Sequence, residues 1–274
     1  MKFIYGVSSA IAQNYSNSAL ETIEFAGKNE FDVVELYCEA PDLIPKYAES
    51  EYIYRLRNVS KQYNLSLQMH APFHSVNLAS FNEKAREVSI ELIKDTIIMG
   101  QALEAKLVTF HLGLCFLPCQ INFENAIEIL VASLNELLDF ASENGIVLAM
   151  ENRGGKLDIG KPEELLMIYK YIKSPHLKIT FDVVQANVLG DPIEHYEILK
   201  KHVVNVHIRD APKGKDRLLA VGEGEIDFKT LVKKFVENHF SGPLIFEVST
   251  KDRALLSRGA LDEYLAEITE TDTM

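Results

Sequence analysis

The chain has few cysteines and no long apolar run. Its three cysteines, Cys38, Cys115 and Cys119, are too few for a disulfide scaffold, which indicates a reducing, cytoplasmic compartment. No run of about 18 or more apolar residues is present, so we expect no membrane-spanning helix. The N-terminal residues MKFIYGVSSAIAQN contain one lysine and a short apolar stretch, which predicts a first strand and not a signal peptide.

Positive charge is also scarce, with 28 Lys and Arg against 40 Asp and Glu and a formal net charge of −12. Such a chain does not attract phosphate backbones through its overall field, which disfavours a nucleic-acid binder. Neither GxGxxG nor GxxxxGK[ST] occurs, so the glycine-rich phosphate loops typical of many open α/β sheets are missing.

The sequence does contain eight short runs of strand-forming apolar residues, whose starts lie roughly 25–40 residues apart. They cover residues 2–9, 31–37, 65–71, 106–112, 146–152, 177–183, 203–209 and 243–249. This spacing leaves room for a helix and two loops after each run. The alternation, without a break in composition, predicts a single α/β domain over residues 1–274, a (β/α)8 or TIM barrel.

Between these runs the apolar period becomes helical. Residues 82–104 carry an apolar stripe from Val88 to Met99, and Ser80 with Glu83 resembles a capping box for this helix. Residues 122–145 predict a second helix that is closed by Gly145. Residues 161–173 predict a third, with Pro162 in its first turn.

Most of the predicted strands carry a carboxylate or an imidazole near their C-terminal ends. These residues are Glu35, His70, His111, Glu151, Asp182, His207 and Glu247. Barrel enzymes place their chemistry at this end of the strands, so the side chains should point into one small volume. Several carboxylates there would repel one another without a cation. Because carboxylates with imidazoles suit Zn²⁺ or Mn²⁺, the pattern predicts a divalent-metal site.

A structural interpretation applies to each of these residues taken alone, since a satisfied polar group at a strand end is common. Their joint periodicity favours the metal. Glu35 is the weakest member and could serve as a hydrogen-bond anchor. We interpret His74 as a loop residue and the remaining histidines, at 176, 195, 202 and 239, as surface or packing residues. The CxxxC at 115–119 is a weak metal signal.

The loops after the fifth, seventh and eighth strands concentrate positive charge. They contain Arg153, Lys156, Arg209, Lys213, Lys215, Arg217, Lys251 and Arg253. One interpretation is solvated loop charge balanced by Asp210, Asp216 and Asp252. The other is an anion site for a substrate phosphate, in which Arg217 is the best candidate for a ligand contact.

At these residues the chain resembles the xylose-isomerase-like TIM-barrel superfamily. The resemblance is carried, in order, by MHAPFHSVNLAS, TFHLG, MEN, FDVVQAN, VHIRD, GKDRLLAVGEGEID and IFEV, between about residues 65 and 248. The superfamily includes sugar and sugar-phosphate isomerases and epimerases and also endonuclease IV. The resemblance implies a shared metal site at Glu151, Asp182, His207 and Glu247. His70 and His111 match the endonuclease-type additions that hold a second metal bridged by Glu151, so one or two ions of Zn or Mn are implied.

Two departures stand out from the endonuclease pattern. The usual Asp-x-x-His is here Asp182-Val-Val-Gln185, and the usual Asp-x-His is Asp216-Arg-Leu218. In the endonuclease these two histidines and the aspartate hold a third zinc, so a three-metal site is not expected. The glutamine can hydrogen-bond a substrate hydroxyl but cannot shuttle a proton.

Three functions follow from this. The first is a metal-dependent isomerase or epimerase of a small sugar or sugar phosphate, which acts through an enediolate. In it the resemblance implies proton transfer by Glu151 and Glu247, and we expect substrate contacts by Arg217, Gln185, Glu35 and Arg153. The second is a two-metal phosphodiesterase similar to endonuclease IV, and the third is a non-catalytic metal- or sugar-binding barrel. A homodimer is compatible with the resemblance, although no feature of the sequence indicates one.

Overall fold

Parallel strands form a closed barrel in the computed structural model, which describes residues 2–11, 18–39, 42–115 and 123–271. The strands are β1 (Ile4–Ser8), β2 (Val33–Tyr37), β3 (Ser66–His70), β4 (Leu107–Phe110), β5 (Val147–Glu151), β6 (Leu177–Asp182), β7 (Val203–Ile208) and β8 (Pro243–Phe246). Each strand pairs with its sequence neighbours, and β1 pairs with β8 to close the ring. The predicted single-domain TIM barrel is confirmed, and every predicted strand is present with shortened ends.

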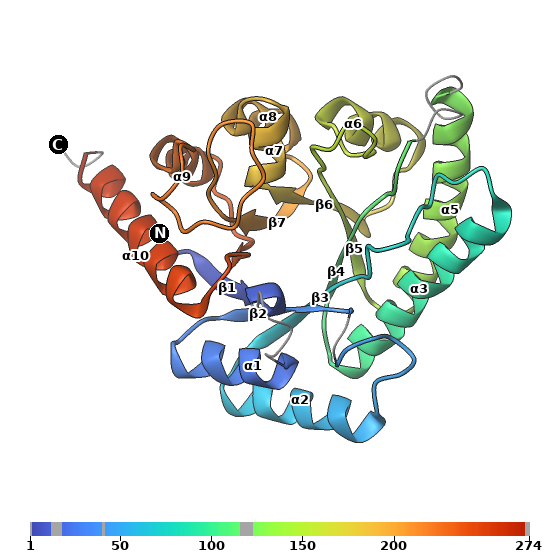
Figure 1. The fold of residues 1–274 in the computed structure, drawn as a ribbon, viewed down its shortest axis with the longest axis horizontal. Coiled ribbons are helices and arrows are strands. Elements are labelled where there is room, and N and C mark those ends of the chain that lie inside the picture. Colours follow the sequence, from blue (N-terminus) through green and yellow to red (C-terminus); the bar gives the residue numbers. More distant parts are fainter. Residues whose placement is uncertain (1, 12–17, 40–41, 116–122, 272–274) are drawn as a thin grey trace.

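Helices surround the barrel on its outside (Figure 1). They are α1 (Ala19–Lys28), α2 (Ser50–Gln62), α3 (Glu83–Ala102), α5 (Phe123–Glu143), α6 (Pro162–Tyr171), α7 (Val183–Leu189), α8 (Pro192–Leu199), α9 (Phe228–Glu237) and α10 (Lys251–Thr271), with a 3-10 turn at Ser9–Ile11. The connection from β6 to β7 contains two short helices, α7 and α8. No helix of the described residues is long and apolar enough to span a membrane.

The helix signals were correct in position but not in every detail. Pro162 occupies the first turn of α6, and Gly145 follows α5 with φ of +66°. The capping box at Ser80 and Glu83 is wrong, because the side chain of Asn82 caps α3 by accepting from the backbone N–H groups of Lys84 and Ala85. The apolar stripe on α3 is also shorter than predicted, since Val88 is 58% exposed.

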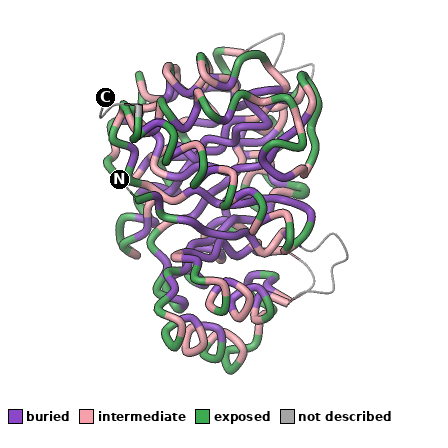
Figure 2. Tube along the Cα trace, turned by 90° about the vertical axis from the view of Figure 1, so that its left-hand side faces the viewer, coloured by how far each residue is buried: buried purple, intermediate pink, exposed green. Residues whose placement is uncertain are grey.

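The core lies between the outer face of the barrel and the inner faces of the helices. Figure 2 shows buried chain in the interior and exposed chain along the outer turns. On α9, for example, Phe228, Leu231, Val232 and Phe235 are buried, and the ring of Phe235 packs edge-on against Tyr196 of α8. This packing holds the strand ends rigidly, so the side chains that project from them are placed by the fold and not by loops.

Candidate active site

The carboxylates and imidazoles predicted at the strand ends lie at one mouth of the barrel. Glu151 and Asp182 are the last residues of β5 and β6, and His207 on β7 is the register partner of Asp182. Glu247 directly follows β8. Ligand atoms of Glu151, Asp182 and His207 lie within 4.8 Å of one another, and the three residues are buried. The Nδ1 atom of His207 lies 3.3 Å from Glu247 and 4.0 Å from Glu151.

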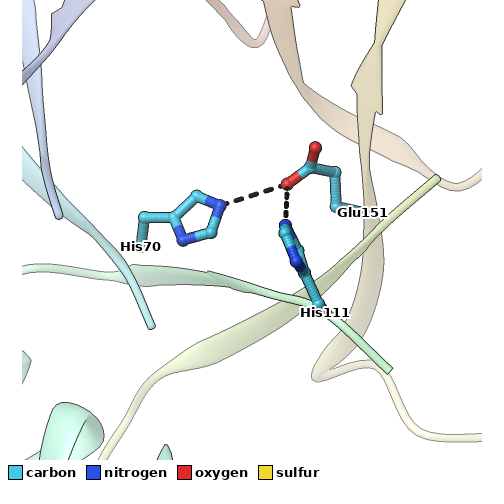
Figure 3. Close-up of side chains that lie close together, drawn as sticks. All are labelled: His70, His111 and Glu151. Atoms are coloured by element: carbon cyan, nitrogen blue, oxygen red, sulfur yellow. Dashed lines mark hydrogen bonds and ion pairs between the residues drawn. The ribbon is translucent and has the colours of Figure 1, made fainter. Parts of the chain in front are cut away.

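His70, which ends β3, and His111, which follows β4, converge on Glu151 (Figure 3). Their Nε2 atoms lie 3.1 Å and 2.8 Å from the same carboxylate oxygen, Oε2. One oxygen of Glu151 therefore faces both imidazoles, and its other oxygen, Oε1, faces the guanidinium of Arg153 at 3.3 Å. This arrangement brings together the residues that the sequence suggested for a second metal.

The hydrogen bonds of His70 limit its protonation state. Its Nδ1 lies 2.8 Å from the carbonyl oxygen of Ala71 and must donate to it. A neutral ring has a single N–H, so Nε2 would then turn a lone pair toward the carboxylate of Glu151. That contact is favourable if the ring is protonated or if a cation lies between the two groups. Burial opposes protonation, but the hydrogen bond and charge of Glu151 raise the pKa of His70 overall.

His207 has the environment of a metal ligand. Its Nε2 lies 2.9 Å from Oε1 of Glu35, while its Nδ1 faces the carboxylates of Glu247 and Glu151. Among the described residues, neither ring nitrogen has a partner in hydrogen-bond geometry, although both are fully buried. A buried imidazole whose back nitrogen faces a carboxylate is a common metal-binding arrangement. The donor set of two glutamates, one aspartate and one imidazole fits a divalent cation.

Glu35 does not reach the mouth of the barrel. Its carboxylate is completely buried in a polar layer beneath the site, where it accepts hydrogen bonds from Gln68 on β3 and Asn205 on β7. Thr109 and Thr180 complete the layer, with their hydroxyls 2.8 Å apart. The contacts of Glu35 are to Gln68, Asn205, Thr109 and the imidazole of His207, as expected of a hydrogen-bond anchor, and its contact with substrate stays a prediction.

Gln185 is also occupied by the protein. Its amide oxygen accepts from the backbone N–H of Gly154 at 2.9 Å, and its nitrogen donates to Asp216 at 2.8 Å. Gln185 is buried, and its amide joins the loop at Gly154 to the loop at Asp216; its contact with substrate stays a prediction. Arg153 contacts Glu151 and Asp158, whereas Arg217 is exposed and donates to the backbone carbonyl of Asp216.

Two residues contact the carboxylates of the site although the sequence did not assign them to it, Arg209 having been grouped only with the loop cations. Arg209 is buried, and its guanidinium bonds Asp182 at 2.7 Å and Asp216 at 2.6 Å. Tyr37 donates its hydroxyl to Glu247 at 2.7 Å and stacks on the ring of His70. Side chains two residues apart on a strand share a face. Tyr37 lies two residues after Glu35, and Arg209 two after His207, so this alternation could have revealed both.

Burial and charge oppose each other throughout the site. Burial raises the pKa of Glu247, and the nearby His207 and Arg209 only partly offset this. Burial would also raise the pKa of Glu151, but His111, His70 and Arg153 outweigh it and hold the pKa well below its usual range. For His111 burial dominates and lowers the pKa to about 4, so the ring is neutral at pH 7 and supplies Glu151 with a hydrogen bond.

The remaining predictions have simple outcomes. His74 is exposed and pairs with Glu39, which agrees with a loop residue. Cys38 is a buried free thiol, Cys115 is buried as well, and Cys119 lies outside the described residues.

Comparison with known proteins identifies the family. The model of the xylose isomerase-like TIM barrel matches residues 23–268. The chain belongs to this family. It is 34% identical to the uncharacterized protein MJ1311 of Methanocaldococcus jannaschii over 98% of this chain and 91% of that protein. A solved structure described as a D-tagatose 3-epimerase-like protein has 31% identity and a TM-score of 0.88, with 99% of both chains covered. A probable endonuclease 4 of Mycoplasmopsis pulmonis is 23% identical over 88% of this chain and 92% of its own length. The chain is thus similar to proteins of both the epimerase and the endonuclease type.

Proposed function

We propose that the chain is a divalent-metal-dependent isomerase or epimerase of a small ketose or ketose phosphate. The observation that carries this proposal is the pair Glu151 and Glu247, which approach the free Nδ1 of His207 at 4.0 Å and 3.3 Å. Two carboxylates beside one buried ligand position can act on opposite faces of a bound carbon atom. The similarity to the D-tagatose 3-epimerase-like structure supports the same reaction class.

Glu151, Asp182, His207 and Glu247 would hold one Zn²⁺ or Mn²⁺ ion. His70 and His111, with Glu151 as a bridge, would hold a second. A bound ion supplies Lewis acidity toward the carbonyl and hydroxyl oxygens of the substrate, which acidifies the C–H between them.

The side chains then move the proton. One glutamate takes the proton from the carbon next to the carbonyl, and the C–H electron pair passes into an enediolate. The other glutamate, protonated at the start, returns a proton to the same carbon from the opposite face for epimerisation. The first glutamate is left protonated, so no other reactant is needed. Tyr37 positions Glu247 through its 2.7 Å hydrogen bond, and Arg153 lies against Glu151.

Proton exchange tests this proposal directly. The metal-loaded protein in deuterated water should replace one carbon-bound proton of a ketose or ketose phosphate, as followed by NMR over a panel of such sugars. Glu151→Gln and Glu247→Gln should each abolish the exchange, because an amide cannot accept the proton. The control is Glu128→Gln, which changes an exposed glutamate of α5 and should leave the rate unaltered. Exchange that survives both site changes would refute the assignment.

A second candidate is hydrolysis of a phosphodiester by two metals bridged by Glu151. It is favoured by the convergence of His70 and His111 on Oε2 of Glu151. It is disfavoured by the surroundings of Asp216. The carboxylate of Asp216 is bonded to the amide of Gln185 and the guanidinium of Arg209, and the imidazoles that would help to hold a third metal are missing. Nicking of an abasic duplex, without proton exchange on any sugar of the panel, would favour this candidate.

A further inference from the structure

A pocket of about 410 Å³ opens beside the metal-ligand cluster. It is lined by Arg209, Asp216, Arg217, Leu218, Leu219 and Arg253, and we name it the arginine pocket. Its walls come from the segment after β7 and from the start of α10. Three guanidinium groups share this pocket with one carboxylate, in a chain whose net charge is −12.

The single carboxylate of the wall is already neutralised. Asp216 pairs with Nη1 of Arg209 at 2.6 Å and accepts from Gln185 at 2.8 Å. Arg253 pairs with Glu223, which is 40% exposed, so solvent screens that contact and a ligand can compete for the arginine. Arg217 has no carboxylate within ion-pair distance among the residues that the structure describes, and its guanidinium donates to the backbone carbonyl of Asp216. The pocket therefore has unused capacity for negative charge.

The structure sorts the eight loop cations that the sequence grouped together. Arg153 turns to Glu151, and the ammonium of Lys251 lies over the ring of Phe25, 5.6 Å from its centroid. The three other lysines, at 156, 213 and 215, do not line the pocket. The cations that remain are all arginines, whose planar, multiple donors suit the oxygens of a phosphate better than lysine does.

Arg209 connects the pocket with the proposed metal site. Its Nη2 bonds the buried Asp182, while its Nη1 bonds Asp216 in the pocket wall. Its side chain is only 7% exposed, so it is fixed between the two places. A ligand with one end among the carboxylates and an anionic end in the pocket would contact the same side chain along its length.

We propose that the arginine pocket binds the phosphate of the substrate, so that the substrate is a sugar phosphate and not a free sugar. The existence of an anion site does not depend on the reaction; its assignment to a substrate phosphate rests on the proposed function. Leu218 and Leu219 supply the apolar part of the lining.

Binding of inorganic phosphate to the full-length chain tests the site without any reaction. Titration by calorimetry in the presence of a chelator prevents phosphate from binding through a metal. We expect saturable binding that is weakened roughly tenfold or more by Arg217→Gln and by Arg253→Gln, because each loses a charge-assisted contact. Arg55→Gln, which changes an exposed arginine of α2, should bind like the unmodified protein. Equal binding in all four proteins would overturn the proposal, and so would acetate competing as strongly as phosphate.

A second measurement separates this proposal from the proposed function. Glu151→Gln should retain phosphate binding while it loses proton exchange. With the unmodified protein, a ketose phosphate should react more efficiently than the matching ketose, and Arg253→Gln should reduce this preference roughly tenfold. Phosphate binding without exchange on any sugar would refute the epimerase and leave the anion site standing. Exchange with no preference for the phosphate ester would refute the phosphate assignment alone.

Discussion

His207 has two ring nitrogens with different tasks. Nδ1 faces the cluster of carboxylates. Nε2 lies 2.9 Å from Oε1 of Glu35, which belongs to the polar layer below. Burial disfavours a charged imidazole, yet the charges of Glu247 and Glu35 raise the pKa of His207 well above its ordinary value. A carboxylate behind a ligating imidazole fixes its tautomer and increases its basicity, so Glu35 should contribute to metal binding without touching the ion.

Substitution of Glu35 tests this contribution. Glu35→Gln keeps the size of the side chain but removes the charge behind His207, and we expect metal affinity to fall by about 10–100-fold. The affinity is measured by competition with a chromogenic chelator, and Glu128→Gln serves as the control. The thermal midpoint of each chelator-treated protein should be recorded as well, because a loss that followed only from partial unfolding would contradict the positioning role.

His195 on α8 should make stability depend on pH. Burial lowers its pKa below the ordinary 6.5, and its Nδ1 is buried without a hydrogen-bond partner among the described residues. As the pH falls below 6.5 the unfolded chain binds the proton first, so the free energy of unfolding decreases toward acid pH. Urea denaturation at about pH 7.5 and 5.5 should show a smaller decrease for His195→Gln than for the unmodified chain. His239→Asn, at an exposed site, should retain the full decrease. If His195→Gln lost as much stability between the two pH values as the unmodified chain, His195 would not be the source of the pH dependence.

At the scale of elements, the sequence predicted strands and their ends better than helix caps and side-chain partners. The runs 146–152 and 177–183 differ from β5 and β6 by one residue at most at either end, because buried strand periodicity is a local property. The cap of α3 was misplaced because Ser80 and Asn82 are both good caps, and the backbone geometry at residue 82 decides between them. The bond between Gln185 and Asp216 could not be predicted, since it joins α7 to the loop after β7, 31 residues further along the chain.

The same corner limits the number of metals. Gln185 and Leu218 stand where imidazoles would be needed, and Asp216 is bonded to Arg209 and Gln185. One carboxylate that already has two partners cannot compete with water for a zinc ion, so elemental analysis should find at most two metals per chain. Gln185→His together with Leu218→His should raise this number toward three, and either change alone should raise it less. Three tightly held equivalents in the unmodified protein would show that other residues supply the ligands.

At the scale of the whole molecule, the barrel concentrates negative charge at one mouth. Glu151, Asp182 and Glu247 are buried together, and Arg209 and Arg153 provide only part of the compensating charge. The eightfold alternation in the sequence was sufficient for the fold, and the strand-end pattern was sufficient for the carboxylates and imidazoles of the mouth. The alternation could place Arg209 and Tyr37 on the inner face, but their partners, Asp182 and Asp216 for Arg209 and Glu247 for Tyr37, depend on how distant strands meet, which one sequence does not reveal.

Metal binding should therefore stabilise the folded chain. An ion that binds only the native state at 100 times its dissociation constant adds about 2.7 kcal/mol, which for a chain of this size corresponds to a rise of several degrees in the thermal midpoint. Scanning calorimetry of the protein with Mn²⁺ or Zn²⁺ and after chelation should show this difference. Asp182→Asn should reduce the difference, because it removes one ligand charge. A midpoint that did not respond to either ion would contradict the metal site.

The polar layer below the mouth has a consequence for how the barrel assembles. Glu35, Gln68, Thr109, Thr180 and Asn205 come from β2, β3, β4, β6 and β7, and they hydrogen-bond to one another only when all these strands are in register. A half-barrel, or a barrel with one strand slipped by a residue, would bury some of these groups without partners at a cost of about 1–3 kcal/mol each. During folding, the layer should therefore penalise closure of a misaligned barrel more strongly than an interior of aliphatic side chains would.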